Sequence, residues 1–205
     1  MLRIDVRADI RSFERTLDNV QRRQIPFATA NALNATARAV QAEERRELPS
    51  VFDRPTPFTL NSIGIVPARK DRLEARVFVK DKQASYLGLQ ETGGTRLPAK
   101  RALVLPARIT LNTYGNMPKG AIKRAIARRD VFVGKVKGMA GIWQRPKDGQ
   151  RRAAPGRMKL LASFEPVAQY RPRLGFVPRA EEVATAAFPR EMRVALAKAL
   201  ATAKP

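Results

Sequence analysis

The 205-residue sequence contains no cysteine and no histidine. Without cysteine, disulfides, thiolate nucleophiles and cysteine-based zinc or iron–sulfur sites are excluded. Without histidine, the chain lacks the usual general base near neutral pH and a common metal ligand, which excludes serine–histidine–aspartate and HExxH sites. No run approaches the 18 apolar residues of a membrane helix, and the start lacks the apolar core of a signal peptide. We therefore expect a protein that is neither exported nor membrane-spanning and that is made in the cytoplasm.

Acidic and aromatic residues are also scarce, with 18 Asp+Glu and 6% aromatics. A metal-dependent nuclease needs two or three carboxylates that converge on Mg²⁺, but the acids are scattered, as in Asp71/Glu74 and Glu181/Glu182. Gly134-Lys135 matches only the end of the phosphate-binding loop motif. We expect no enzyme, no catalytic residue, no metal and no cofactor; a nuclease would require a carboxylate cluster that only the fold could assemble.

Basic residues dominate instead: 40 Lys+Arg, of which 28 are arginine, give a net charge of +22. The excess is concentrated, because residues 101–157 hold 14 basic and 2 acidic side chains and so carry +12 of it. We interpret this stretch as a contact surface for DNA or for an acidic protein partner. Its candidate contact residues are Lys119, Lys123, Arg124, Arg128, Arg129, Lys135, Lys137, Arg145, Arg151 and Arg152.

The spacing of apolar residues predicts the first half of the fold. Residues 2–7 suit a short strand, and a helix with apolar residues at helical spacing follows from Ile10 to Val20. An alanine-rich helix is predicted over 26–48, between Pro26 and Pro49. Residues 60–80 alternate between apolar and polar side chains, which indicates a β-hairpin with one buried face.

Shorter segments complete the expected architecture. Strands are predicted at 85–90, 103–107, 131–137, 141–145 and 159–164, and Pro178 is expected to open a pair of C-terminal helices that Pro189 breaks or kinks. Because strands and helices are segregated, we predict an α+β fold: an antiparallel β-sheet with the long N-terminal helix packed on it, C-terminal helices and extended loops. We expect one domain, 1–205, with arms at 92–118 and 146–157.

The basic surface leaves three interpretations open: sequence-independent contact with DNA, contact with acidic proteins, or a solvated face. No helix-turn-helix, RNP-type or basic coiled-coil motif is present, so DNA contact would be sequence-independent and salt-sensitive. Trp143, in Gly141-Ile142-Trp143-Gln144-Arg145, could stack on a base, but its strand context favours a core or subunit-interface role.

Three segments carry a resemblance to a known family. They are Tyr86-Leu87-Gly88-Leu89-Gln90-Glu91-Thr92-Gly93-Gly94-Thr95-Arg96, Leu111-Asn112-Thr113-Tyr114-Gly115-Asn116-Met117-Pro118-Lys119-Gly120, and the segment 141–145. Together with the early Ala/Asn-rich helix and the late helix after Gly175-Phe176-Val177-Pro178, they resemble the minor tail protein Z-like family of tailed bacteriophages, also called tail completion or neck proteins. The long basic loop at 146–157 departs from that pattern.

The resemblance implies a structural virion protein of the tail or neck, assembled in the host cytoplasm. Such a head–tail connector component would form a homo-oligomeric ring, expected to be a hexamer, around the DNA passage. Its partners would be other tail or neck proteins and, non-specifically, genomic DNA. The expected subunit-interface residues are Trp143, Tyr86, Gly93, Gly94 and Arg96. The alternative is a stand-alone, sequence-independent nucleic-acid-binding protein, associated with the nucleoid or with RNA.

Overall fold

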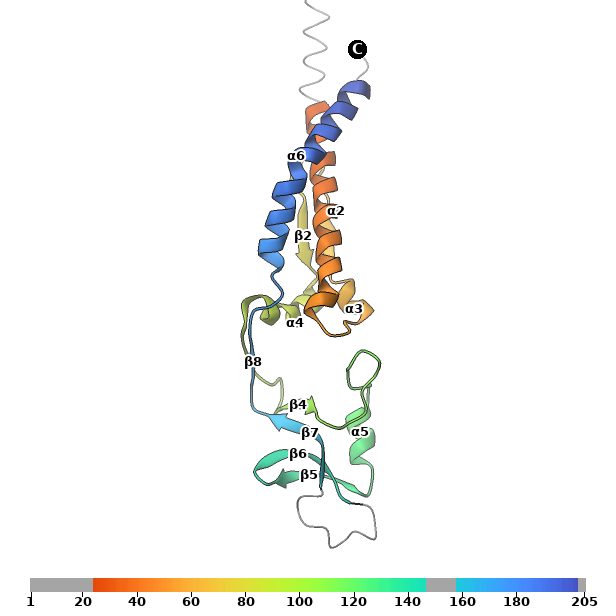
Figure 1. Ribbon diagram of the computed structural model, residues 1–205, viewed down its shortest axis with the longest axis vertical. Coiled ribbons are helices and arrows are strands. Elements are labelled where there is room, and N and C mark those ends of the chain that lie inside the picture. The colour runs from red at the N-terminus through yellow and green to blue at the C-terminus, as the bar shows by residue number, and fades with distance from the viewer. Residues whose placement is uncertain (1–23, 147–157, 203–205) are drawn as a thin grey trace, which may run out of the picture. The chain divides into compact units, whose positions relative to one another are not determined.

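The computed structural model describes residues 24–146 and 158–202 (Figure 1). The predicted strand at 2–7, the predicted helix from Ile10 to Val20 and nearly all of the predicted arm at 146–157 lie outside these residues. The chain divides into two compact units, which the backbone enters more than once: unit 1 comprises 1–48, 60–83 and 175–205, and unit 2 comprises 49–59 and 84–174. The sequence predicted one domain, and the two units are described in turn.

Unit 1 combines two long helices with a two-stranded antiparallel sheet. Its elements are α2 (Ile25–Val51), β1 (Ile63–Val66), β2 (Arg76–Val79) and α6 (Phe176–Thr202). The β1–β2 pair, with Ile63 opposite Val79, confirms the predicted hairpin. The side chain of Asn34 on α2 holds Ala68 by two hydrogen bonds, Nδ2 to the carbonyl oxygen at 3.0 Å and backbone N to Oδ1 at 2.7 Å. These two hydrogen bonds attach α2 to the segment that connects β1 and β2.

A buried ion pair joins the two helices of unit 1. The Nη2 atom of Arg179 on α6 lies 3.0 Å from Oε2 of Glu44 on α2, and the Glu44 side chain is 1% exposed. Small residues line the buried face of α2, among them Ala28, Ala32 and Ala37, and they allow close approach of neighbouring backbone. The alanine-rich stripe is thus packing surface.

The predicted pair of C-terminal helices is wrong, because one helix, α6, runs through Pro189. Proline removes one backbone hydrogen bond, but its fixed φ is compatible with a helix. Ala187 and Ala199 are buried on either side of it, so packing holds both halves in one continuous element. Of the residues that the structure describes, no helix is long and apolar enough to cross a membrane.

Unit 2 is built around a four-stranded antiparallel sheet in the order β4-β7-β6-β5. These strands are β4 (Leu103–Pro106), β5 (Val131–Val136), β6 (Met139–Gln144) and β7 (Lys159–Glu165). The register shifts at β7, where Ala162 pairs with Ile142 but Leu160 pairs with Trp143, so Leu161 is an extra residue. Both Leu161 and Ala162 are buried in the core with Ile142 and with Ala125 of α5 (Ala121–Ile126). The bulge thereby places two consecutive side chains in one core.

The rest of unit 2 consists of short helices and a small strand pair. These elements are α3 (Pro57–Leu60), α4 (Asp81–Thr92), β3 (Gly94–Arg96) and β8 (Ala168–Tyr170); α4 begins within unit 1. The strand predicted at 85–90 is wrong, since these residues belong to α4. Gln83, Leu87 and Gln90 are buried at spacings of four and three, which is a helical period that the short window concealed.

The α+β class is confirmed, with a long N-terminal helix and a C-terminal helix; α4 and α5 lie between strands along the chain, so helices and strands are only partly segregated. The segment 92–118, which the sequence predicted as an arm, contributes β3 and β4 to the two sheets of unit 2. Thr92 is the last residue of α4, and the other residues, Gly93, 97–102 and 107–118, lie in loops without helix or strand.

Candidate nucleic-acid and partner interface

Eight of the ten predicted basic contact residues are described, and all eight are exposed side chains of unit 2. They come from α5 and its flanks, from the β5–β6 hairpin and from the end of β6. The eight are Lys119, Lys123, Arg124, Arg128, Arg129, Lys135, Lys137 and Arg145. Arg151 and Arg152 lie outside the described residues. The basic residues that are concentrated in one part of the sequence are therefore exposed to solvent, and all eight belong to unit 2.

Local backbone geometry directs the charges of α5 outward. Gly120 precedes the helix with a φ of 76°, a left-handed conformation that glycine adopts without steric cost. Ala121 and Ala125 face the core, so Lys123 and Arg124 lie on the exposed side. The Nη1 atom of Arg124 donates to the carbonyl oxygen of Lys119 at 3.0 Å, which holds one guanidinium against the start of the helix.

Two further arginines, Arg128 and Arg145, are also held by intramolecular contacts. Arg128 forms a two-point ion pair with Asp130, at 3.0 Å from Nε to Oδ1 and 2.6 Å from Nη2 to Oδ2. The hydrogen bonds from Arg128 and then from Gln144 lower the pKa of Asp130. The guanidinium of Arg145 lies 4.6 Å from the centre of the Phe132 ring, and the Arg145 backbone N–H donates to the carbonyl oxygen of Asp130. Arg128 and Arg145 therefore stabilise the turn between α5 and β5.

The remaining cations are available to a partner. Among the described residues, no ion pair engages Lys123, Arg129, Lys135 or Lys137. Exposed ammonium groups bind phosphates and carboxylates as point charges and read no sequence. Such a surface can hold a polyanion or an acidic protein in a salt-dependent manner.

The predicted interface residues make contacts within their own chain. Trp143 is only 8% exposed and pairs across the sheet with Phe132, so its indole offers no stacking platform. Its Nε1 atom is buried and has no hydrogen-bond partner among the described residues. The Tyr86 hydroxyl lies 3.0 Å from Oγ1 of Thr59.

The glycine pair after α4 has a conformational role. Gly93 has a φ of 73°, and its N–H donates to the carbonyl oxygen of Leu89 at 3.0 Å, which ends the helix. A Cβ at Gly93 would lie 2.9 Å from Cδ of Pro172. Gly94 pairs with Tyr170 in the β3–β8 sheet, and Arg96, in the same strand, is exposed. Of these three, only Arg96 offers a side chain to a neighbour.

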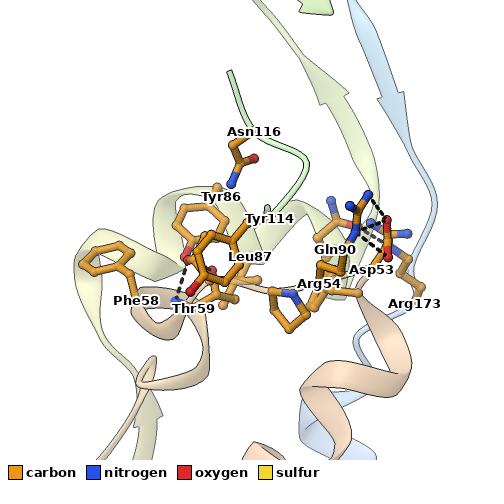
Figure 2. A pocket seen from close by; sticks show the side chains of 13 residues that line it. Asp53, Arg54, Phe58, Thr59, Tyr86, Leu87, Gln90, Tyr114, Asn116 and Arg173 are labelled. Carbon is orange, nitrogen blue, oxygen red and sulfur yellow. Dashed lines mark hydrogen bonds and ion pairs between the residues drawn. The ribbon is translucent and has the colours of Figure 1, made fainter. Parts of the chain in front are cut away.

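A cavity of about 370 Å³ in unit 2 was not predicted from the sequence (Figure 2). Phe58, Tyr86 and Tyr114 lie toward one end of the view, and Arg54, Asp53 and Arg173 lie toward the other (Figure 2). The residues come from 52–59, from α4, from 114–116 and from 173, and among them the sequence analysis singled out Tyr86 as an interface residue. Because these segments lie far apart in the sequence, no short sequence motif could identify the cavity.

The polar groups of the cavity bind one another. Arg54 contacts Asp53 through Nε and through Nη2 at 3.0 Å, and the Asp53 hydrogen bond raises the pKa of Arg54. Arg173 donates from Nε to Oε1 of Gln90 at 2.7 Å, and its guanidinium lies 5.0 Å from the centre of the Phe52 ring. Within the described part of the chain, no group of three or more acidic side chains could hold a metal ion.

Comparisons of the chain with protein-family models, with curated proteins and with solved structures find no match. The features that bear on function are the sequence segments 86–96, 111–120 and 141–145 and the exposed basic surface of unit 2.

Proposed function

We propose that the protein is a structural component of a long-tailed bacteriophage virion, a tail completion or head–tail joining protein without enzymatic activity. In this proposal several copies, six in the expected ring, surround the passage of the DNA and contact other tail or neck proteins. The protein would be assembled in the host cytoplasm and reside in the tail or neck of the particle. The sequence segments 86–96, 111–120 and 141–145 support this proposal through the family that they resemble.

One structural observation carries the physical side of the proposal: the exposed cations of unit 2 that no acidic residue of the described chain neutralises. A subunit at the DNA passage needs a positively charged surface that tolerates any base sequence. Because Trp143 is buried, the surface has phosphate-binding side chains without an exposed indole. This combination suits passing duplex DNA better than it suits the reading of single strands, in which bases stack on aromatic side chains.

Genetic removal of the protein tests the assembly role. A phage that lacks it should still make filled heads and tails, either separate or joined in defective particles, as seen by electron microscopy of lysates. An arrest of DNA packaging itself would contradict a role in the tail or neck. Complementation with Lys119→Ala/Lys123→Ala/Arg129→Ala should lower the yield of infectious particles, because three of the exposed cations of α5 and its flanks are lost.

A matched control removes the same charge from the other unit. Arg38, Arg193 and Lys198 are exposed residues of unit 1, and their replacement by alanine should leave the particle yield unchanged. Equal losses with the two triple variants would show that net charge, rather than this surface, matters. Thermal melts of both variants would reveal any loss of folding.

The exposed cations also favour a second candidate, a stand-alone nucleic-acid-binding protein. In that case the purified protein should bind duplex DNA tightly as a monomer, and the α5-flank variant should flatten the slope of log affinity against log salt by up to about 2.7, since each lost phosphate contact changes the slope by about 0.9. Weak binding by a monomer and strong binding only by an assembled ring would favour the virion role.

A further inference from the structure

Within residues 24–146 and 158–202, the outer strand of the main sheet in unit 2 is paired on one side only. β5 is the last strand in the order β4-β7-β6-β5 and appears at the border of the sheet in Figure 1. It is six residues long and contains no proline, and its pairing with β6 has no register shift from Val131 to Val136. A regular outer strand that no other described strand covers can accept a further strand.

The turn at the end of the hairpin determines which backbone groups point outward. Lys137 and Gly138 form a two-residue connection, and both have positive φ, 49° and 84°, as in a type I′ turn. The flanking pair, Val136 and Met139, then closes the hairpin by hydrogen bonds, and hydrogen-bonded pairs alternate along the strands. The N–H and C=O groups of Val133 and Lys135 consequently face away from β6.

The opposite border of the sheet is less suited to strand addition. β4 has four residues and ends on Pro106, which has no N–H to donate. β5 is therefore better suited than β4 to accept a further strand. On β5, Val133 is 52% exposed and Lys135 is also exposed.

The charges near β5 favour an acidic occupant. Lys135 lies within the strand and Lys137 in its turn, while Arg129 precedes it. The nearest acid, Asp130, is bound by Arg128. Two copies of this strand would bring lysines together, and like charges on paired strands are destabilising. A second copy is therefore disfavoured, whereas an extended segment with alternating carboxylates would complement both the backbone and the side chains.

We propose that β5 is a docking strand for an extended acidic segment of another protein, which adds to the sheet by main-chain hydrogen bonds to Val133 and Lys135 and by ion pairs to Lys135 and Lys137. The inference deepens the proposed function, on which it rests for the nature of the partner, a neighbouring virion protein. It also distinguishes between the two classes of partner, since a DNA duplex would use the lysines but has no strand to offer to the backbone.

The direct test uses the full-length protein and a capped heptapeptide in which glutamate and valine alternate. Titration to millimolar concentration, followed by ¹H–¹⁵N NMR, should shift the amide signals of Val133 and Lys135 and slow their exchange with solvent. The same peptide with its three central nitrogens methylated keeps its charge but cannot pair, so it should bind at least several-fold more weakly. A lysine–valine peptide serves as the charge control.

Two variants separate the backbone from the charge. Val133→Pro removes the backbone N–H of residue 133, which points away from β6 and forms no hydrogen bond with that strand. The substitution should weaken peptide binding by about 2- to 13-fold, the range expected for the loss of one net hydrogen bond. Val133→Ala keeps the N–H and should bind as the wild type does, apart from lost apolar contact. Lys135→Glu changes an exposed side chain and should weaken binding by about 2- to 5-fold or more, whereas Lys198→Glu in unit 1 should have no effect.

The outcomes are distinct. Equal binding of the plain and methylated peptides, signal changes away from β5, or no binding at millimolar peptide would overturn the docking strand. Binding of a DNA duplex that Lys135→Glu weakens and Val133→Pro does not, together with no response to the peptide, would assign the surface to nucleic acid. If the peptide binds but a phage without the protein assembles normally, the result would support β5 as a docking strand and contradict the proposed role in the virion.

Discussion

The buried ion pair of unit 1 provides a sharp test of the division into two units. Glu44→Gln removes the carboxylate charge from a site where the side chain is 1% exposed and leaves Arg179, 21% exposed, beside an uncharged partner. Removing one member of a buried pair costs about 3–5 kcal/mol. For a domain of 60–100 residues, each kcal/mol lowers the midpoint temperature by about 4–8 °C, so unit 1 should melt more than about 12 °C earlier.

Two spectroscopic probes report on the two units separately. Most helical residues of the described part of the chain belong to α2 and α6, so circular dichroism at 222 nm is expected to follow mainly unit 1. The single tryptophan, Trp143, lies in unit 2, so its fluorescence follows that unit. The Glu44→Gln change should lower the dichroism midpoint and leave the fluorescence midpoint in place.

The neighbouring residue supplies the control. Glu43 pairs with Arg46, whose side chain is 72% exposed, and such surface pairs contribute about 0–1 kcal/mol. Glu43→Gln should therefore change little. If Glu44→Gln lowered both midpoints together, the two units would unfold as one cooperative structure; if it lowered neither, the buried pair would not stabilise unit 1. A Glu44→Leu/Arg179→Leu double variant should recover much of the loss, because it removes both charges of the pair.

Two further predictions concern unit 2. Gly141→Ala should destabilise unit 2 by about 1–3 kcal/mol or more, because the added Cβ would lie within 3 Å of both the Ala162 carbonyl oxygen and a Leu160 methyl group. Gly88→Ala should be neutral or stabilising, because Gly88 lies in a helix and its added Cβ would meet nothing within 4 Å. Urea unfolding followed by tryptophan fluorescence compares the two variants. The Asp130 pKa is lowered, so its stabilising contribution is present above about pH 4, the ordinary aspartate value, and decreases as pH falls through the lowered folded-state pKa. Asp130→Asn should flatten the acid side of the stability–pH profile of unit 2, and an unchanged profile would refute the role of the Arg128 pair.

Local patterns predicted the elements whose signals are local. Alternation over residues 60–80 identified the β1–β2 hairpin, and the apolar segments 131–137 and 141–145 identified β5 and β6 to within two residues at each end. The same reasoning failed at 85–90, where a short apolar window fits a strand or a helix equally well, and at Pro189, where burial on both sides keeps one helix intact.

The candidate site was predicted only in part for the same reason. The sequence located the cations of residues 119–145, but it could not show that Arg128 and Arg145 are held by contacts with Asp130 and Phe132. Nor could it show the cavity, whose lining joins residues from Phe52 to Arg173.

The sequence by itself determined the α+β class, the absence of cysteine and histidine chemistry and the concentration of positive charge in residues 101–157. Periodicity and composition are properties of neighbouring residues, so they can be read without the fold. The tertiary structure decided which cations are free, that Trp143 is buried and that β5 lies at the border of its sheet. These properties depend on pairings such as Leu103 with Glu165, which bring distant residues together and leave no mark on the local sequence.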